Sequence, residues 1–104
     1  MKTNKEHLLE GISDYVQRAI YNSKPLFSCV ALDYTLAMLF PFDNEFHHKI
    51  NEEYRLFLID KDLQVSSYYG FYISVSSDDY ETKEALLKEF IETKLNDNLE
   101  VLND

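Results

Sequence analysis

The chain has 104 residues, a length that fits one folded domain. Hydrophobic residues make up 45% of it, including 8 tyrosines and 7 phenylalanines, so one core can form without disulfides or metals. The 19 acidic residues outnumber the 10 basic ones and give a net charge of −9. This charge argues against a nucleic-acid backbone as the direct ligand, because proteins bind phosphates through lysine and arginine.

The negative charge is concentrated in the second half of the chain. Residues 53–104 contain 12 acidic and 5 basic residues, a balance of −7, whereas residues 1–52 contain 7 and 5, a balance of −2. Such an excess of negative charge favours solubility, attracts the protein to basic surfaces and repels it from anionic membranes. Cys29 is the only cysteine, no apolar stretch reaches the roughly 18 residues of a membrane span, and the N-terminus lacks a signal-peptide pattern. We therefore expect a cytoplasmic protein.

The first predicted element is a helix that begins after Thr3. Thr3 and Glu6 have the spacing of a capping box, and apolar residues then recur every three or four positions until 22–25, where Asn-Ser-Lys-Pro ends the pattern. Gly11 lies inside this helix, at a cost of up to about 1 kcal/mol relative to alanine. Either another segment packs close to its backbone or the helix is slightly weakened there.

Residues 26–40 are apolar almost throughout, so periodicity does not separate a buried strand from a buried helix. Local alternation favours a strand through about Tyr34, although the residues after it are good helix formers. Pro41 ends the segment. The polar stretch 43–52 is compatible with a short helical turn on the surface.

Residues 54–59 and 63–76 are rich in aromatic and β-branched residues and are predicted as two antiparallel strands joined by the charged turn 60–62. Gly70 marks a bulge or bend in the second strand. Alternation along that strand places polar and tyrosine side chains on one face: Ser66, Tyr68, Tyr72, Ser74 and Ser76.

A closing helix is predicted after Ser77, Asp78 and Asp79, whose side-chain oxygens are suited to capping it. Its apolar stripe consists of Leu86, Leu87, Phe90, Ile91 and Leu95. The expected fold is therefore α+β, in the order α-β-β-β-α, with the N- and C-terminal helices packed on one face of a three-stranded antiparallel sheet. We expect a single domain over residues 1–104, with a frayed tail from about residue 97.

Few residues suggest catalysis or a cofactor. His48 and Glu52, with His47 and Glu53 nearby, could share one face of a turn, but a metal site needs three or four convergent ligands, and surface histidines are the simpler interpretation. Cys29 lies in an apolar segment, where core packing is favoured over thiol chemistry. The pairs Asp60 with Asp62 and Asp78 with Asp79 are explained by turns and caps. We predict no enzyme activity, cofactor or metal.

The leading functional hypothesis is a small acidic protein-binding module. It would act as an inhibitor or immunity-type protein that occupies a basic, nucleic-acid-binding site on a larger protein, by analogy in charge and size alone with phage-encoded nuclease inhibitors such as anti-CRISPR proteins. The predicted contact residues are carboxylates and the tyrosine face: Asp60, Asp62, Tyr68, Tyr72, Ser74, Glu81, Glu84 and Glu92. The alternative is a structural or regulatory subunit that self-associates through the Tyr and Ser face, as a homodimer. A small enzyme built on Cys29 or the histidine pair ranks last.

Overall fold

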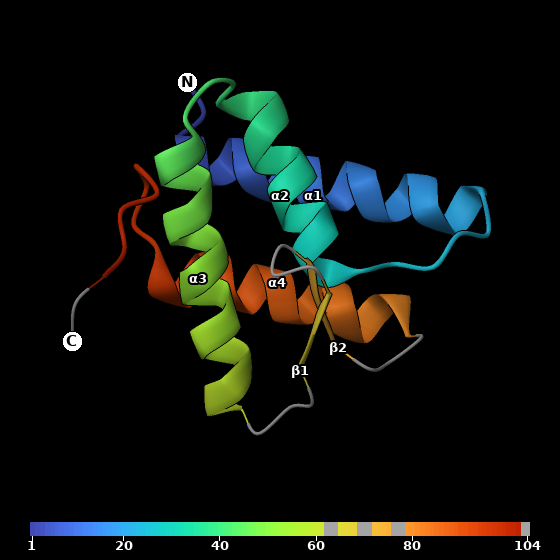
Figure 1. Cartoon of the computed structure of the whole chain (residues 1–104). Helices are drawn as coiled ribbons and strands as arrows, with labels where there is room; N and C mark the ends of the chain where they lie inside the picture. The colour runs from blue at the N-terminus through green and yellow to red at the C-terminus, as the bar shows by residue number, and fades with distance from the viewer. Residues whose placement is uncertain (62–64, 69–71, 76–78, 103–104) are drawn as a thin grey trace.

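The computed structural model describes residues 1–61, 65–68, 72–75 and 79–102, and the side chains within 1–61 and 79–102. This part of the chain forms a helical bundle with a small hairpin, and the expected α+β fold with a three-stranded sheet is wrong. The elements are α1 (Asn4–Tyr21), α2 (Ser28–Leu39), α3 (Asn44–Asp60), β1 (Val65–Tyr68), β2 (Tyr72–Val75) and α4 (Tyr80–Lys94). In Figure 1, α1 and α4 run antiparallel, and α2 and α3 cross in front of them.

The capping box predicted for α1 is confirmed. The Glu6 amide donates to Thr3 Oγ1 at 3.1 Å, and the Thr3 amide donates to Glu6 Oε1 at 3.2 Å. The two bonds satisfy backbone donors that the first turn leaves unpaired. The helix buries a stripe made of Leu8, Ile12, Val16 and Ala19.

The strand expected from residue 26 to about Tyr34 is instead helix α2. Its inward side buries Leu32 and Leu36, whereas Tyr34 and Met38 on the outer side remain about half exposed. Because α2 is apolar on all sides, no amphipathic period marks it as a helix. Its N-cap, Phe27, also provides no side-chain hydrogen bond, so the sequence carries no start signal.

The strand expected at 54–59 is the second half of α3. This helix begins after Asp43, whose carboxylate accepts the Phe46 amide at 3.2 Å, and it continues through the stretch predicted as a surface turn. The residues that it buries follow helical spacing: His47, Ile50, Tyr54, Phe57 and Leu58. Packing of this continuous stripe overrides the β preference of its aromatic residues.

The single strand expected at 63–76 is divided into β1 and β2, which pair antiparallel with each other. Tyr68 lies opposite Tyr72 and Ser66 lies opposite Ser74 in the register. The chain therefore reverses between the two strands, and the described sheet has two strands rather than three. The hairpin lies beside α2, and β1 also approaches α3.

The closing helix is confirmed as α4, with Asp79 as its N-cap: the Asp79 carboxylate accepts the Glu81 amide at 2.9 Å and the Thr82 hydroxyl at 2.6 Å. Beyond this helix, where the sequence-based expectation is a frayed tail, Leu95 forms a bridge with Val101 and Leu99 is 1% exposed. The segment after α4 thus turns back onto the bundle.

The helices and the segments beside them enclose one hydrophobic cluster. At its centre, the ring of Phe90 on α4 lies 5.1 Å from Tyr54 and 5.5 Å from Phe57, both on α3. These ring contacts join α3 to α4. In the described part of the chain, no helix combines the length and the apolar character required to traverse a lipid bilayer.

Candidate functional site

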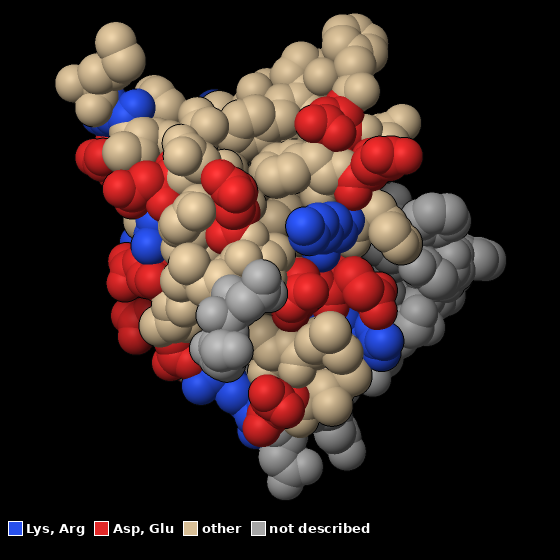
Figure 2. All heavy atoms as spheres, turned by 90° about the vertical axis from the view of Figure 1, so that its left-hand side faces the viewer, with Lys and Arg blue, Asp and Glu red and all other residues tan. Residues whose placement is uncertain are grey.

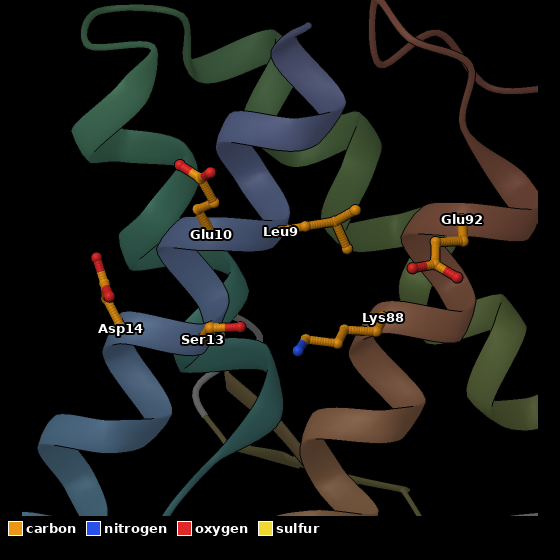
Figure 3. Close-up of a pocket in the computed structure, with 6 residues that line it drawn as sticks. All are labelled: Leu9, Glu10, Ser13, Asp14, Lys88 and Glu92. Carbon is orange, nitrogen blue, oxygen red and sulfur yellow. The ribbon is translucent and has the colours of Figure 1, made fainter. Parts of the chain in front are cut away.

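The strongest candidate site is a groove between α1 and α4. It consists of two neighbouring hollows of about 340 and 390 Å³ that share Lys88. The first, shown in Figure 3, is lined by Leu9, Glu10, Ser13, Asp14, Lys88 and Glu92. The second is lined by Val16, Gln17, Ile20, Tyr80, Glu81, Glu84, Ala85 and Lys88. Together these residues define the α1–α4 groove.

Helical spacing explains how α4 supplies the acidic side of the groove. Glu81, Glu84, Lys88 and Glu92 follow one another at intervals of three, four and four residues, which keeps them on one face of a helix. Glu81 and Glu92 are exposed and Glu84 is half-buried. The three α4 carboxylates of the leading hypothesis are thus brought together on one surface.

The opposite side of the groove comes from α1, where Glu10 and Asp14 are both exposed. Figure 3 shows Leu9 pointing from α1 toward α4, whereas Glu10 and Asp14 point toward the outer side of α1. The groove therefore has an apolar floor at Leu9 and carboxylates along its edges. Glu10 and Asp14 were not predicted as contact residues, because their place beside α4 depends on tertiary packing.

Lys88 is the only basic residue among the described residues that line the groove. Its Nζ lies 2.9 Å from Glu84 Oε1, and Figure 3 shows its side chain reaching toward Ser13 of α1. Five carboxylates and this single ammonium line the groove, so its lining carries an excess of negative charge. The Glu84–Lys88 pair is partly exposed and contributes only a few tenths of a kcal/mol, roughly 0.3–0.5, to the stability of the helix.

Two lysines near the start of α1 contact the helices that form the groove without lining it. Lys2 Nζ lies 2.5 Å from Glu10, and its hydrogen bond and attraction to that carboxylate raise the pKa of the Lys2 ammonium above its ordinary value. Lys5 Nζ donates to the backbone carbonyls of Glu92 and Leu95 at 3.0 Å each. Lys5 therefore ties α1 to the end of α4 and leaves the Glu92 carboxylate exposed.

Acidic residues also lie outside the groove. Figure 2 shows the side of the molecule that carries α3 and the C-terminal segment, where Asp and Glu side chains are spread with Lys and Arg among them. Asp60, at the end of α3, is exposed but does not line the groove, and Asp62 lies outside the described residues. Any test of the groove must therefore separate its own charges from the overall charge of the molecule.

The Tyr and Ser face predicted for 63–76 cannot be a side of a three-stranded sheet, since the described strands form only a hairpin. Tyr68, Tyr72 and Ser74 belong to β1 and β2 by their backbone, and their side chains lie outside the described residues. The self-associating sheet face therefore remains a prediction from sequence alone.

The residues considered for catalysis lie in different environments. Cys29 is buried in α2, and His47 is buried with its Nε2 at 2.8 Å from the Phe40 carbonyl, whereas His48 is exposed. Asp79 acts as a helix cap, and its hydrogen bonds with Thr82 lower the pKa of its carboxyl. Within the residues that the structure describes, no group of three or more His, Cys, Asp or Glu side chains could hold a metal ion.

The side chains of Lys83 and Tyr54 carry buried polar groups that the sequence pattern did not indicate. Lys83, in the middle of the α4 pattern, is 5% exposed and donates from Nζ to the Leu26 carbonyl at 2.6 Å. The Tyr54 hydroxyl is enclosed between α2 and α3. A lysine or tyrosine in a helical pattern gives no signal that its polar end is buried, because the same residue types are common at surfaces.

Comparison of the chain with protein-family models, curated proteins and solved structures finds no match. The geometry and charge of the α1–α4 groove are therefore the best guide to the function of the chain.

Proposed function

We propose that the chain is a small acidic protein-binding module that docks through the α1–α4 groove onto a basic surface of a larger protein. The observation that supports this most directly is the alignment of Glu81, Glu84 and Glu92 along the groove, with Glu10 and Asp14 on its α1 edge. Acidic grooves attract basic partners at a distance and suppress contacts with acidic ones.

The dimensions of the groove suit a folded basic surface. Glu81 and Glu92 are eleven residues apart, which corresponds to about 16 Å along the helix axis at a rise of 1.5 Å per residue. Leu9 and Ile20 add apolar area between the carboxylates, and a stable interface needs such a water-excluding centre within a charged rim. The groove thus combines the two components of a protein-binding surface.

The basic surfaces on which lysine and arginine gather most densely are those that bind nucleic acids. Carboxylates that occupy such a surface exclude the nucleic acid, so the proposed role is inhibitory. Because Cys29 is buried and is the only cysteine of the chain, the protein needs no oxidising environment, and we place its action in the cytoplasm.

The experiment that tests this proposal compares two charge variants as affinity baits in a lysate of the cells that express the chain naturally. The first variant, Glu81→Gln with Glu92→Gln, removes two charges from the groove. The second, Glu45→Gln with Glu53→Gln, removes two charges from α3; Glu45 matches Glu81, since each lies in the first turn of its helix. A partner that the wild type and the α3 variant retain, and the groove variant loses, supports the groove.

The captured partner is then purified and tested with its nucleic acid. We expect the chain to displace the nucleic acid competitively and its affinity for the partner to fall at least tenfold between about 50 and about 300 mM NaCl, since exposed charges are screened by salt. Equal capture by both variants, or an affinity that does not depend on salt, would contradict the proposal.

A further inference from the structure

A third hollow, of about 210 Å³, is lined by residues from the C-terminal end of α1, the linker 22–27 and α2. Figure 1 shows this linker returning from the end of α1 to the start of α2. The hollow is lined by Tyr15, Arg18, Ala19, Asn22, Lys24, Pro25 and Tyr34, and we call it the Tyr–Arg cleft. Two cationic residues and no carboxylate line it, so its charge is opposite to that of the α1–α4 groove. Such a reversal is unexpected in a protein with a net charge of −9.

The two cations of the cleft have no anionic partner among the residues that the structure describes. The ion pairs of the described part of the chain are formed by Lys2, Arg55, Lys61 and Lys88. Neither Arg18 nor Lys24 takes part in one. Their charged ends are therefore available to a ligand that carries its own negative charge.

Capping of α1 does not explain these side chains either. The carbonyls of residues 18, 19 and 20 accept hydrogen bonds from the backbone amides of Asn22, Lys24 and Ser23, at 3.0, 2.9 and 3.1 Å. The Asn22 side chain adds a second bond to the Arg18 carbonyl at 2.8 Å. Because these three carbonyls of the last turn are satisfied in this way, the guanidinium and ammonium groups are not needed as their donors.

The wall of the cleft opposite the linker is aromatic. The rings of Tyr15 and Tyr34 lie 5.5 Å apart at an angle of 53°, which joins α1 to α2. Tyr34 is 49% exposed, and Tyr15 is half-buried, so that burial raises the pKa of its hydroxyl. The cleft therefore offers uncharged ring surface and hydroxyl groups beside its two cations.

The linker side of the cleft is fixed to α4 at two points. The Tyr80 hydroxyl donates to the Lys24 carbonyl, and the buried Lys83 ammonium donates to the Leu26 carbonyl at 2.6 Å. A site that is held in place before its ligand arrives loses less conformational entropy on binding. This anchoring distinguishes the cleft from a loop whose side chains meet by chance.

We propose that the Tyr–Arg cleft binds a small phosphate that is attached to a flat ring, a chemistry represented by a nucleoside monophosphate. Arg18 and Lys24 would hold the phosphate, since guanidinium pairs with oxyanions through two parallel hydrogen bonds, and the ring would lie against Tyr34 and Tyr15. A nucleic-acid polymer would bring further phosphates against the acidic surface, whereas a monophosphate places its charge only at the two cations. This proposal does not depend on the function of the α1–α4 groove.

The test is a titration of the whole chain with adenosine monophosphate. Binding is measured by calorimetry and by changes in the NMR signals of Tyr15 and Tyr34. We expect adenosine alone and inorganic phosphate alone to bind at least tenfold more weakly than the monophosphate. The double substitution Arg18→Gln with Lys24→Gln should weaken binding of the monophosphate at least tenfold, and Tyr34→Leu should weaken it severalfold.

The matched control is Lys49→Gln with Lys94→Gln, which removes the same charge; Lys94, like Arg18, lies in the last turn of its helix. This control should bind the monophosphate within about twofold of the wild type, and circular dichroism should show that every variant is folded. Absence of binding at millimolar monophosphate, equal loss in the two double variants, or equal binding of inorganic phosphate would each overturn the proposal.

Discussion

Thr35 of α2 packs directly against Gly11 of α1, so that a Cβ atom at position 11 would overlap the Thr35 Cγ2 methyl group. Thr35 is fully buried, and its Oγ1 donates to the Ala31 carbonyl at 2.7 Å. The methyl group therefore cannot rotate away without breaking a buried hydrogen bond. Of the two interpretations of Gly11 that the sequence left open, close approach of another segment is the correct one.

We predict that Gly11→Ala destabilises the protein by about 1–3 kcal/mol, although alanine is the better helix former, because overpacking outweighs helix propensity at a closed contact. Thr35→Ser removes the methyl group and keeps the hydroxyl, so the double variant should recover most of the stability lost in Gly11→Ala. Urea unfolding followed by circular dichroism measures all three variants. A Gly11→Ala protein as stable as the wild type would show that the two helices can separate there at little cost.

Tyr54 gives a prediction about alkaline pH. Burial raises the pKa of its hydroxyl above the ordinary tyrosine value of 10.0. The folded state therefore retains the proton at pH values where the unfolded chain loses it, so this contribution to stability is intact below pH 10 and declines above it. We expect the free energy of unfolding of the wild type to fall by on the order of 1 kcal/mol per pH unit above about pH 10.

The Tyr54→Phe variant should lose less stability between about pH 8 and about pH 11. At neutral pH its stability should lie within about 1 kcal/mol of the wild type, because the buried hydroxyl has at most the Ser28 side chain as a partner among the described residues. Tyr21→Phe is the control, since Tyr21 is 89% exposed. Urea midpoints across this pH range measure the effect, and equal alkaline losses in wild type and Tyr54→Phe would contradict it.

The helices at the two ends of the chain were predictable because each has a cap and an apolar stripe of its own. Thr3 with Glu6 and Asp79 with Thr82 act locally, and such signals are readable in a sequence. The middle of the chain was misread for two reasons. α2 is apolar on nearly every side, and the stripe of α3 runs through one stretch predicted as a surface turn and another predicted as a strand.

The candidate site was predictable only on one of its two sides. The spacing of Glu81, Glu84 and Glu92 places them on one helix face regardless of the rest of the fold. This face lies beside α1 because of the way the helices pack. The predicted fold, with its three-stranded sheet, did not contain that packing. The Tyr–Arg cleft was missed for the same reason, because Arg18 and Tyr34 belong to different helices.

The turn between α2 and α3 contains a strained residue. Phe42 has a φ of 71° and is 99% exposed, so its side chain gains little from packing while its backbone adopts a left-handed conformation. We predict that Phe42→Asn stabilises the protein by up to about 1 kcal/mol, because asparagine tolerates this conformation better than phenylalanine. Phe42→Ala, which removes the ring and keeps the strain, should not stabilise it. Thermal unfolding of the three proteins tests this, and a gain in Phe42→Ala equal to that in Phe42→Asn would show that the exposed ring, not the backbone, is unfavourable.

Lys88 provides the prediction that is most specific to the α1–α4 groove. The Lys88→Gln substitution removes the only cation among the described residues that line the groove, and it also frees Glu84 from its ion pair. The groove therefore becomes more negative. We expect affinity for a lysine- and arginine-rich peptide, measured by fluorescence anisotropy at low salt, to rise about two- to fivefold, and the difference to shrink as salt increases. The control is Lys49→Gln, which changes the net charge equally on α3, outside the groove. If both substitutions raise the affinity equally, the peptide responds to the net charge of the protein; a rise confined to Lys88→Gln identifies the groove as the place where basic ligands bind.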